Sequence, residues 1–494
     1  MVAHKSQLAR SCDRCYSLKE RCQWNTDSSR CERCIRLNQL CQTKRPTKKP
    51  GRPTRIHSVQ LSSPRSPRIL PSPRLQQNTS DSAISIASTE RDELGQIPTS
   101  SDVAQFSPIQ RLSEMGHLSI PERDLLELRL LKDESMLQFI IGPSFHNEHR
   151  EYLVSHLVTF VETLKDGYMA CALSWTGDEP WPQIGDCYQY AASALSTLRS
   201  VEVKDAQGMS LCLALGHAIL TFSLRLRAND VLAICRQTLT QIKHTYQQDS
   251  ARKLLSAGDI GALNYIGLTD LAESLLSGNI PTIRYRICTE NTSYVDCYIG
   301  LCTSLMPLYY DLGELSHSLL QASRRIVNDE TLATEIQKAL GELEITIRNW
   351  RPNVPEGFTT RFTTTEVLEM LSQAKAMQGA ALLILHRLRY PFGSEDTSAR
   401  AMALDILTQL DMTIRVTKKP IVCVGLQVLV ACLELHSDAE RAQWLNNISP
   451  DGMSTYSEPF NDRIKAIVTA VWVARQQSSR IYWYHLGNTI PTLL

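Results

Sequence analysis

Apolar residues recur along most of this chain at spacings of three and four positions, the pattern of amphipathic helices. The clearest stripe runs from Thr364 to Tyr390. Thr363 and Glu366 have the spacing of a capping box, which predicts where this helix begins. Pro391 predicts its end, because the residue before a proline avoids helical backbone. Since the alternation typical of strands is scarce, we expect a mostly α-helical protein.

This pattern begins near Ser119, where Pro121 suits a first helical turn. We therefore expect a large all-α domain over residues 119–494, and no linker within it requires a division in two. The helices predicted from the periodicity span residues 147–164, 183–198, 207–224, 230–244, 260–276, 364–390, 398–416, 421–435 and 461–484, with more between 294 and 350.

The periodicity is absent between residues 46 and 118. Up to about residue 60 this segment is basic and interrupted by Pro and Gly, which excludes a helix. It then becomes rich in Ser, Pro, Thr and Gln with few large apolar residues, so it cannot bury enough surface to offset its ordering entropy. We expect a disordered linker over 46–118.

Charge divides the chain unevenly. Residues 1–80 hold 17 Lys and Arg against 4 Asp and Glu, a net of +13; the whole chain is +1, so the remainder carries −12. A basic head indicates a polyanionic partner. We expect no secretory signal and no membrane partner, because the N-terminus lacks an apolar stretch and the longest apolar run, near 421–433, is too short to span a bilayer. In a reducing compartment, clustered cysteines are metal ligands rather than disulfides.

Six of the fifteen cysteines lie in one short block with a repeated pattern, C-x2-C-x6-C. Thiolates at the C-x2-C spacing chelate zinc from a single turn. Six thiolates fill the eight ligand places of two tetrahedral zinc ions only if two of them bridge, so the pattern predicts a binuclear cluster. Acidic residues after each leading cysteine, Asp13 and Glu32, suit the start of a short helix. The predicted ligands are Cys12, Cys15, Cys22, Cys31, Cys34 and Cys41.

This block, within residues 1–45, resembles the fungal-type zinc binuclear cluster DNA-binding domain. The resemblance implies that Cys12 and Cys31 bridge, with Cys15 and Cys22 completing one zinc site and Cys34 and Cys41 the other. It also implies that the end of the first short helix enters the DNA major groove over a CGG-like triplet. The implied DNA contacts are Lys19 and Arg21, with Arg14 as a further cation.

The block departs from the family pattern at Leu18 and Tyr16, where many members have a cation, and it lacks a proline between its halves. These changes leave the six zinc ligands intact, but they bear on the affinity for DNA and on which base triplet is preferred. A zinc module that binds protein rather than DNA is the alternative.

The basic segment after the cluster contains Lys48, Lys49 and Arg52, which we expect to contact phosphate or to act as a nuclear-import signal. Residues 50–53 resemble an AT-hook, but with Pro50 where AT-hooks usually have Arg; a solvated basic linker is the simpler interpretation.

The body resembles the helical regulatory domain of fungal zinc-cluster activators, clearest in residues 234–246 and 268–317. Together the two resemblances imply a nuclear transcription factor of RNA polymerase II genes, serving a secondary-metabolite gene cluster in some relatives. Its partners would be double-stranded DNA and the transcription machinery or co-regulators. No heptad run in 46–118 provides a dimerising coiled coil, so either the body forms a homodimer, or the protein binds DNA as a monomer or on loosely spaced half-sites.

Motifs for catalysis are absent from the sequence: there is no G-x-S-x-G, P-loop, G-x-G-x-x-G or HExxH, and we expect no enzyme activity. His146 and His149 share a helix face and are expected at the surface. Trp175 and Trp181 fit either a ligand pocket or ordinary packing. The nine cysteines beyond residue 41 are expected in the core, as small apolar side chains.

Overall fold

The structure is a computed structural model. Its chain forms two compact units, Met1–Ile97 and Pro98–Leu494, which are described separately. Residues 48, 49 and 52 and the predicted linker lie outside the described part, apart from residues 117 and 118. The described residues are 11–17, 19, 21–23, 30–37, 39, 41–43, 117–175, 186–226, 230–286, 294–324, 330–449, 452–453, 457–477 and 480–489.

In the N-terminal unit, the described residues form two short helices, α1 (Asp13–Ser17) and α2 (Glu32–Arg36). Both begin directly after a cysteine, as the acidic residues Asp13 and Glu32 predict.

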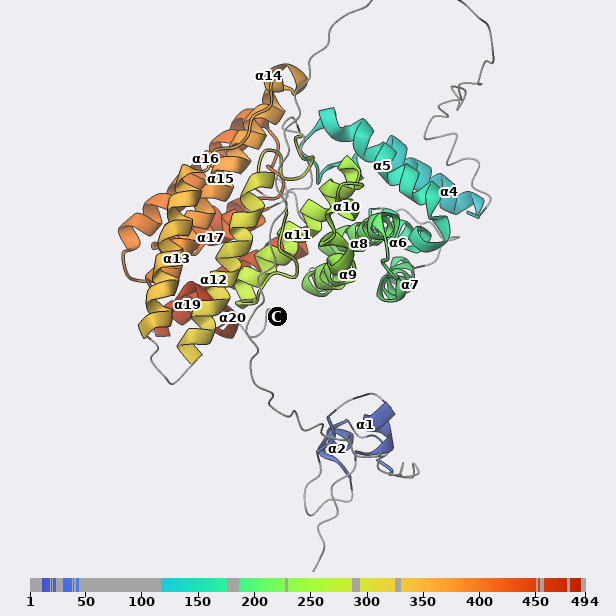
Figure 1. The fold of residues 1–494 in the computed structure, drawn as a ribbon, viewed down its shortest axis with the longest axis horizontal. Helices are drawn as coiled ribbons and strands as arrows, with labels where there is room; N and C mark the ends of the chain where they lie inside the picture. Colours follow the sequence, from blue (N-terminus) through green and yellow to red (C-terminus); the bar gives the residue numbers. More distant parts are fainter. Residues whose placement is uncertain are drawn as a thin grey trace, which may run out of the picture. The chain divides into compact units, whose positions relative to one another are not determined.

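The larger unit is helical throughout its described residues, apart from loops and one isolated β-bridge. Its first group of helices, cyan to green in Figure 1, is α4 (Ile120–Glu127), α5 (His146–Thr159), α6 (Val161–Leu173), α7 (Cys187–Ser200), α8 (Ala206–Leu226), α9 (Val231–Tyr246), α10 (Asp249–Arg252) and α11 (Ala257–Ser277). The second group, yellow to red, is α12 (Met306–Arg324), α13 (Glu330–Asn349), α14 (Phe358–Arg361), α15 (Thr364–Arg389), α16 (Asp396–Thr417), α17 (Gly425–Cys432), α18 (Asp438–Asn447), α19 (Glu458–Gln477) and α20 (Leu486–Thr489). The prediction of a mostly α-helical protein with a large helical body is therefore confirmed.

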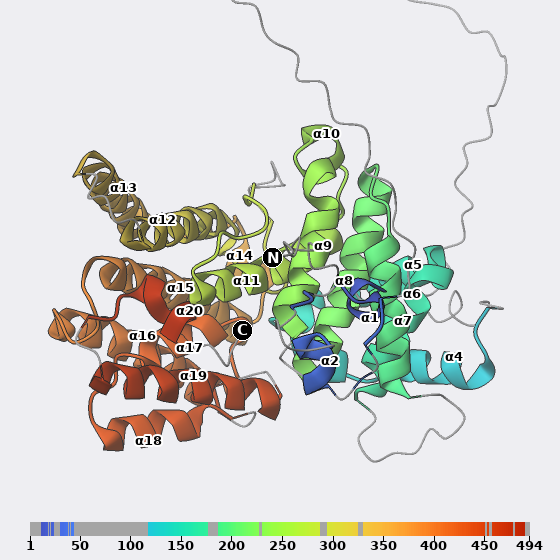
Figure 2. The same ribbon diagram turned by 90° about the horizontal axis from the view of Figure 1, so that it is seen from below.

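Helix α11 joins the two groups into one body. It packs against α5, α8 and α9 on one side and against α12 and α20 on the other, and Figure 2 shows it between them. Its N-terminus carries a capping box, Ser256 with Asp259, and Gly278 ends it in the left-handed conformation. Because both groups bury apolar side chains on this helix, the body has one continuous core.

Helix α8 is the most apolar helix of the first group. By length and composition alone it could cross a membrane, but most of it is buried inside the body, against α6, α9 and α11. Burial by neighbouring helices accounts for its all-round apolar character.

The predicted helix at 147–164 is wrong as a single element, because α5 and α6 are separate helices that meet at Phe160. The backbone of Phe160 leaves the helical region at φ −129° and ψ 41°. Its carbonyl still accepts the N–H groups of Thr163 and Leu164, so one residue ends α5 and begins α6. The bend lets the two helices bury differently directed faces, which a continuous periodicity cannot reveal.

Two predicted helices near the C-terminus, 421–435 and 461–484, have different bounds in the structure. Residues 421–424 precede α17 as buried non-helical chain, with Cys423 at φ 57°, and the Gln373 amide donates to the Val422 carbonyl at 2.8 Å. Helix α19 ends at Gln477, and Trp483 lies in a 3-10 turn where its indole N–H binds the Leu275 carbonyl at 3.0 Å. Helix α18 was not predicted, although Ser437 and Glu440 form a capping box at its start.

The prediction that His149 lies at the surface is also wrong, because its side chain is buried. Only 5% of it is exposed, and its ring lies against the rings of His217 and Tyr298. Burial, together with the neighbouring His217, lowers the pKa of His149 to about 3, so the ring stays neutral. His146 is half-buried.

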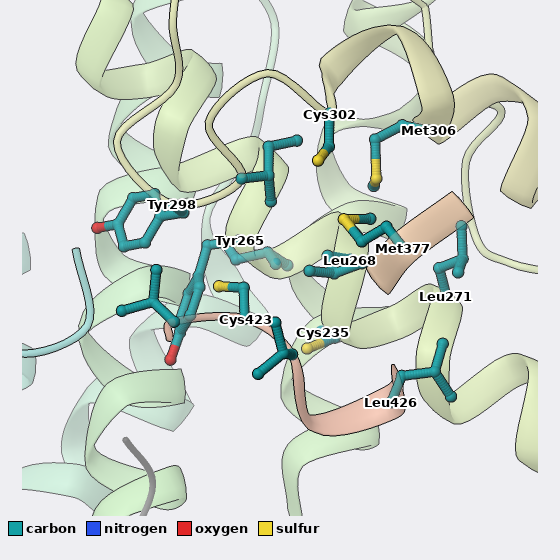
Figure 3. Close-up of a cluster of buried hydrophobic side chains, with 14 of the residues drawn as sticks. Cys235, Tyr265, Leu268, Leu271, Tyr298, Cys302, Met306, Met377, Cys423 and Leu426 are labelled. Atoms are coloured by element: carbon teal, nitrogen blue, oxygen red, sulfur yellow. The ribbon is translucent and has the colours of Figure 1, made fainter. Parts of the chain in front are cut away.

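The cysteines of the body lie mainly in the core, as predicted. Cys187 and Cys297 are partly buried, and Cys288 lies outside the described residues. Figure 3 shows Cys235, Cys302 and Cys423 among apolar side chains, including Met306 and Met377. Trp175 packs against Phe139, with ring centroids 5.9 Å apart, whereas Trp181 lies outside the described residues. The fully buried cysteines are Cys171, Cys212, Cys235, Cys302, Cys423 and Cys432.

Candidate metal centre

The two C-x2-C-x6-C halves of the cysteine block adopt matching local structures. Cys12 and Cys31 each lie immediately before a short helix, and Cys15 and Cys34 follow one turn later inside it. This spacing turns successive cysteines toward one point; the N–H of Cys15 lies 3.4 Å from the Cys12 sulfur. The third cysteine of each half follows after the helix has ended.

The two halves bind each other symmetrically through their backbones. The first N–H of α1, on Asp13, donates to the Gln42 carbonyl at 2.7 Å, and the first N–H of α2, on Glu32, donates to the Gln23 carbonyl at 3.0 Å. Each bond runs from the helix of one half to the residue after the third cysteine of the other. These cross-links satisfy N–H groups that short helices leave unpaired, and they hold the cysteines of both halves together.

The six thiols form two groups of four that share Cys12 and Cys31, and within each group all sulfur atoms lie within 4.8 Å of one another. The shared pair is 3.7 Å apart, and Cys12–Cys34 and Cys15–Cys31 are each 3.8 Å apart. Sulfurs at about 2.3 Å from a tetrahedral zinc ion are separated by about 3.8 Å. The residues therefore fit zinc in donor type, number and spacing.

Burial and hydrogen bonding distinguish the shared thiols from the others. Burial raises the pKa of all six, and for Cys15, Cys22, Cys34 and Cys41 the net pKa is raised. At the two shared thiols, hydrogen bonds from the backbone and from neighbouring thiols outweigh burial and bring the pKa of Cys31 down to about 6. The shared positions thus favour the thiolate that a metal requires.

The predicted DNA-contacting cations of the first half lie on and after α1. Arg14 is half-buried on the helix, whereas Lys19 and Arg21 are exposed. Lys19 has a left-handed backbone, φ 54°, and its N–H donates to the Tyr16 carbonyl at 3.1 Å, which closes the turn after α1. The predicted contacts Lys48, Lys49 and Arg52 lie outside the described residues.

Arg30 supports the second half, a role that the sequence reasoning missed. Its guanidinium donates to the carbonyl of Gln39 at 2.5 Å and lies 3.4 Å from that of Cys34. It thereby ties the chain after α2 to the helix itself. The available signal was that Arg30 precedes Cys31 where Ser11 precedes Cys12, a charge difference between otherwise matching positions.

In the body, a serine, a histidine and an aspartate meet, but their arrangement is not that of a nucleophile. The Ser210 hydroxyl lies 2.6 Å from both the Asp259 carboxylate and the Nε2 of His156. Asp259 and Ser210 therefore face the same ring nitrogen, whereas a catalytic triad needs the acid at the opposite nitrogen. Here Nδ1 faces the Tyr152 carbonyl. The cluster ties α5, α8 and the start of α11 together.

Comparison with known proteins identifies one family. Residues 264–490 match the fungal specific transcription factor domain, over just under half of the 494 residues. The match agrees with the helical regulatory domain that the sequence resembles, and a transcription factor family is not an enzyme family, as expected for this chain. No curated protein and no solved structure is detectably similar to the chain.

Proposed function

The chain carries a fungal specific transcription factor domain behind an N-terminal six-cysteine cluster, and from this premise we propose that it is a nuclear, sequence-specific DNA-binding transcription factor of RNA polymerase II genes. It reads a CGG-like triplet through a cluster of two zinc ions, while the helical body contacts the transcription machinery or co-regulators. The observation that carries the proposal is the sharing of Cys12 and Cys31 between two groups of four thiols.

Zinc would be held by Cys12, Cys15, Cys22 and Cys31 at one site and by Cys12, Cys31, Cys34 and Cys41 at the other. When bound, it supplies the folding free energy that a block with so few apolar residues lacks. The buried residues described in this unit are Cys12, Cys15, Cys31 and Cys34, and Cys22 and Cys41 pack against them partly buried, so the thiols themselves form its centre. Removal of metal would take away the bonds that hold the six sulfurs together, and few apolar contacts are present to replace them, so metal binding and folding of the head are coupled.

The first half of the cluster is the proposed DNA-reading half. Lys19 and Arg21 are exposed close to the end of α1, and Lys and Arg side chains donate to the O6 and N7 atoms of guanine. At the position matching Lys19 the second half has Asn38, and at the position matching Arg21 it has Leu40. The asymmetry in charge supports groove contacts by the first half and a supporting role for the second.

An electrophoretic mobility shift assay with the zinc-loaded full chain tests this proposal. The chain should shift a duplex containing CGG more strongly than a scrambled duplex, and a chelator should abolish the shift. Lys19→Ala should reduce the discrimination between the duplexes by about 1–3 kcal/mol, the value of a good base contact. Arg36→Ala is the matched control, because Arg36 is an exposed cation in the last turn of α2; it should weaken both duplexes equally, if at all.

Equal binding of both duplexes by the zinc-loaded chain would contradict sequence reading. If that chain binds no DNA but retains zinc, the cluster instead serves protein recognition, as in a co-regulator. Nuclear location is checked by imaging a tagged chain, and genome-wide occupancy mapping would show whether its targets form a secondary-metabolite gene cluster.

A further inference from the structure

An open groove lies between α12 and α13, which run side by side at the edge of the body (Figures 1 and 2). Its volume is about 730 Å³, and the segment after α11 also lines it. This segment contributes Ile280 and Arg284, and Ile280 is 44% exposed. The remaining lining residues are Leu308, Asp311, Glu314, Leu315, Ser318, Ala339, Glu342, Leu343 and Thr346.

The two helices contribute to the groove by their periodicity. On α12, Leu308 and Leu315 are seven residues apart and therefore lie on one face, two turns from each other. On α13, Ala339 and Leu343 are four apart and extend the apolar surface on the facing side. The lining on α12 runs from residue 308 to 318, a length of about 16 Å at the helical rise of about 1.5 Å per residue. Its apolar part, from Leu308 to Leu315, is about 10 Å long and matches about two turns of a third helix.

The groove has an acidic rim. Three carboxylates, on Asp311, Glu314 and Glu342, line it against one guanidinium, that of Arg284, and outside the lining the Lys338 ammonium lies 3.9 Å from the Glu342 carboxylate. Arg284 is already shared, since it donates to both Asp311 and Glu314. Burial raises the pKa of Asp311, and Glu314 raises it further, while Arg284 only partly offsets the two. Further positive charge at this rim would therefore be stabilising.

The two hydroxyl groups that line the groove do not make it attractive to an anionic ligand. Ser318 donates to the Glu314 carbonyl at 2.9 Å, and Thr346 donates to the Glu342 carbonyl at 2.8 Å. Both bonds lie within their own helices, so the donors that an anionic ligand needs are already engaged. An apolar floor with acidic walls is the complement of an amphipathic helix that carries leucines on one face and lysines or arginines beside them.

We propose that the groove between α12 and α13 is a docking site for a basic amphipathic α-helix of a partner protein. The helix places its apolar face on Leu308, Leu315 and Leu343 and its cations against Glu314 and Glu342. Naming that partner as a co-regulator of transcription rests on the function proposed above, whereas the binding itself requires neither zinc nor DNA. Loss of DNA binding and loss of helix binding are therefore separate results.

The test measures fluorescence anisotropy of a labelled peptide with the full chain. The peptide has about 14 residues, with leucine at i, i+3, i+4 and i+7 and lysine at the flanking positions; a second peptide has glutamate in place of each lysine. The lysine peptide should bind saturably and at least about tenfold more tightly than the glutamate peptide. Ala339→Trp fills the groove and should abolish binding. Glu342→Lys should weaken it about fivefold, an effect that high salt diminishes.

Glu458→Lys is the matched control, because it makes the same charge change at an exposed site on α19, a helix that contributes no residue to the groove. It should leave affinity within about twofold of the unmodified chain. Thermal unfolding of each variant verifies that the body is folded. Equal weakening by both substitutions, equal binding of both peptides, or binding that survives Ala339→Trp would overturn the proposal. It would also be overturned if sedimentation showed a dimer that Ala339→Trp dissociates, since the occupant would then be a second copy of this chain.

Discussion

Replacing Glu366 with alanine should destabilise the helical body by about 3–5 kcal/mol, far more than loss of a surface helix cap. Its carboxylate accepts four hydrogen bonds: two from Thr363, through N at 2.8 Å and Oγ1 at 2.9 Å, and two from Ser144, through N at 2.8 Å and Oγ at 2.7 Å. Gly142 passes so close to this carboxylate that a Cβ there would lie 2.5 Å from it. The side chain thus caps α15 and also holds a segment 222 residues away.

The magnitude follows from the groups that the substitution leaves behind. Glu366 is 1% exposed, so water cannot readily replace the carboxylate. Two backbone N–H groups, those of Ser144 and Thr363, lose their acceptor, and each unsatisfied group costs about 1–3 kcal/mol. The two hydroxyls lose an acceptor as well but can rotate toward other partners. The sum is several kcal/mol, against about 1 kcal/mol for an ordinary capping residue.

The same contacts set a pH dependence. Burial raises the pKa of Glu366, but the hydrogen bonds from Ser144 and Thr363 outweigh it and hold the pKa below the ordinary 4.5. Because the folded pKa is lowered, its stabilisation is complete above pH 4.5 and is lost as the pH falls through the folded value. Glu366→Gln should therefore reduce the acid sensitivity of the body while lowering its stability at neutral pH.

Urea titration of the full chain, followed by far-ultraviolet circular dichroism, measures these effects. Ser144→Ala should cost about 1–2 kcal/mol alone but little in the Glu366→Ala background, because the bond it removes is already gone. Glu440→Ala is the control: it removes the acid of the α18 capping box, which pairs with the Arg400 side chain. Additive effects of the Ser144 and Glu366 substitutions, or equal losses in Glu366→Ala and Glu440→Ala, would refute the reasoning.

Three further outcomes are expected. Burial raises the pKa of Glu369 to about 7, so ionisation of this side chain destabilises the folded body increasingly as the pH rises from 4.5 to 7. Glu369→Gln should therefore stabilise the body by about 1–3 kcal/mol at pH 8, measured by the same urea titration. Arg463→Met should lower the free energy of unfolding by about 3–5 kcal/mol, because it leaves the buried carboxylate of Glu273 unpaired. Adding Glu273→Met to Arg463→Met should recover most of that loss. Metal analysis should find two zinc ions per chain; Cys31→Ala should lose both and Cys22→Ala about one, because Cys31 belongs to both thiol groups and Cys22 to one.

Local chemistry made much of this protein predictable. The capping box that begins α15 needs only Thr363 and Glu366, which are three positions apart. A C-x2-C pair needs only one turn of chain. Both features can therefore be recognised from the sequence alone. The stripe of α15 was read correctly to within one residue at its end, because Pro391 acts on its immediate neighbour. The helical class of the body and the six-cysteine cluster follow from interactions of this short range.

Contacts between distant segments were not predictable. The bend at Phe160 depends on two helices burying different faces, and the non-helical residues before α17 accept a hydrogen bond from the Gln373 amide at Val422. His149 is expected at the surface because no third metal ligand accompanies His146 and His149 in the sequence, yet the packing of His217 and Tyr298 covers it. Periodicity within a helix gives a direction for each side chain but does not identify what lies there.

The sequence by itself determined the six metal-binding candidates, the helical body and the start of α15, because spacing along the chain controls which thiols and caps can meet. Only the tertiary structure decided that Asp13 and Glu32 cross-link the two halves of the cluster, and that Glu366 also binds Ser144. It also decided that α12 and α13 leave an acidic groove between them. The reason is physical: a hydrogen bond or a burial depends on distance in space, and for residues far apart in the chain only the packing of the helices sets that distance.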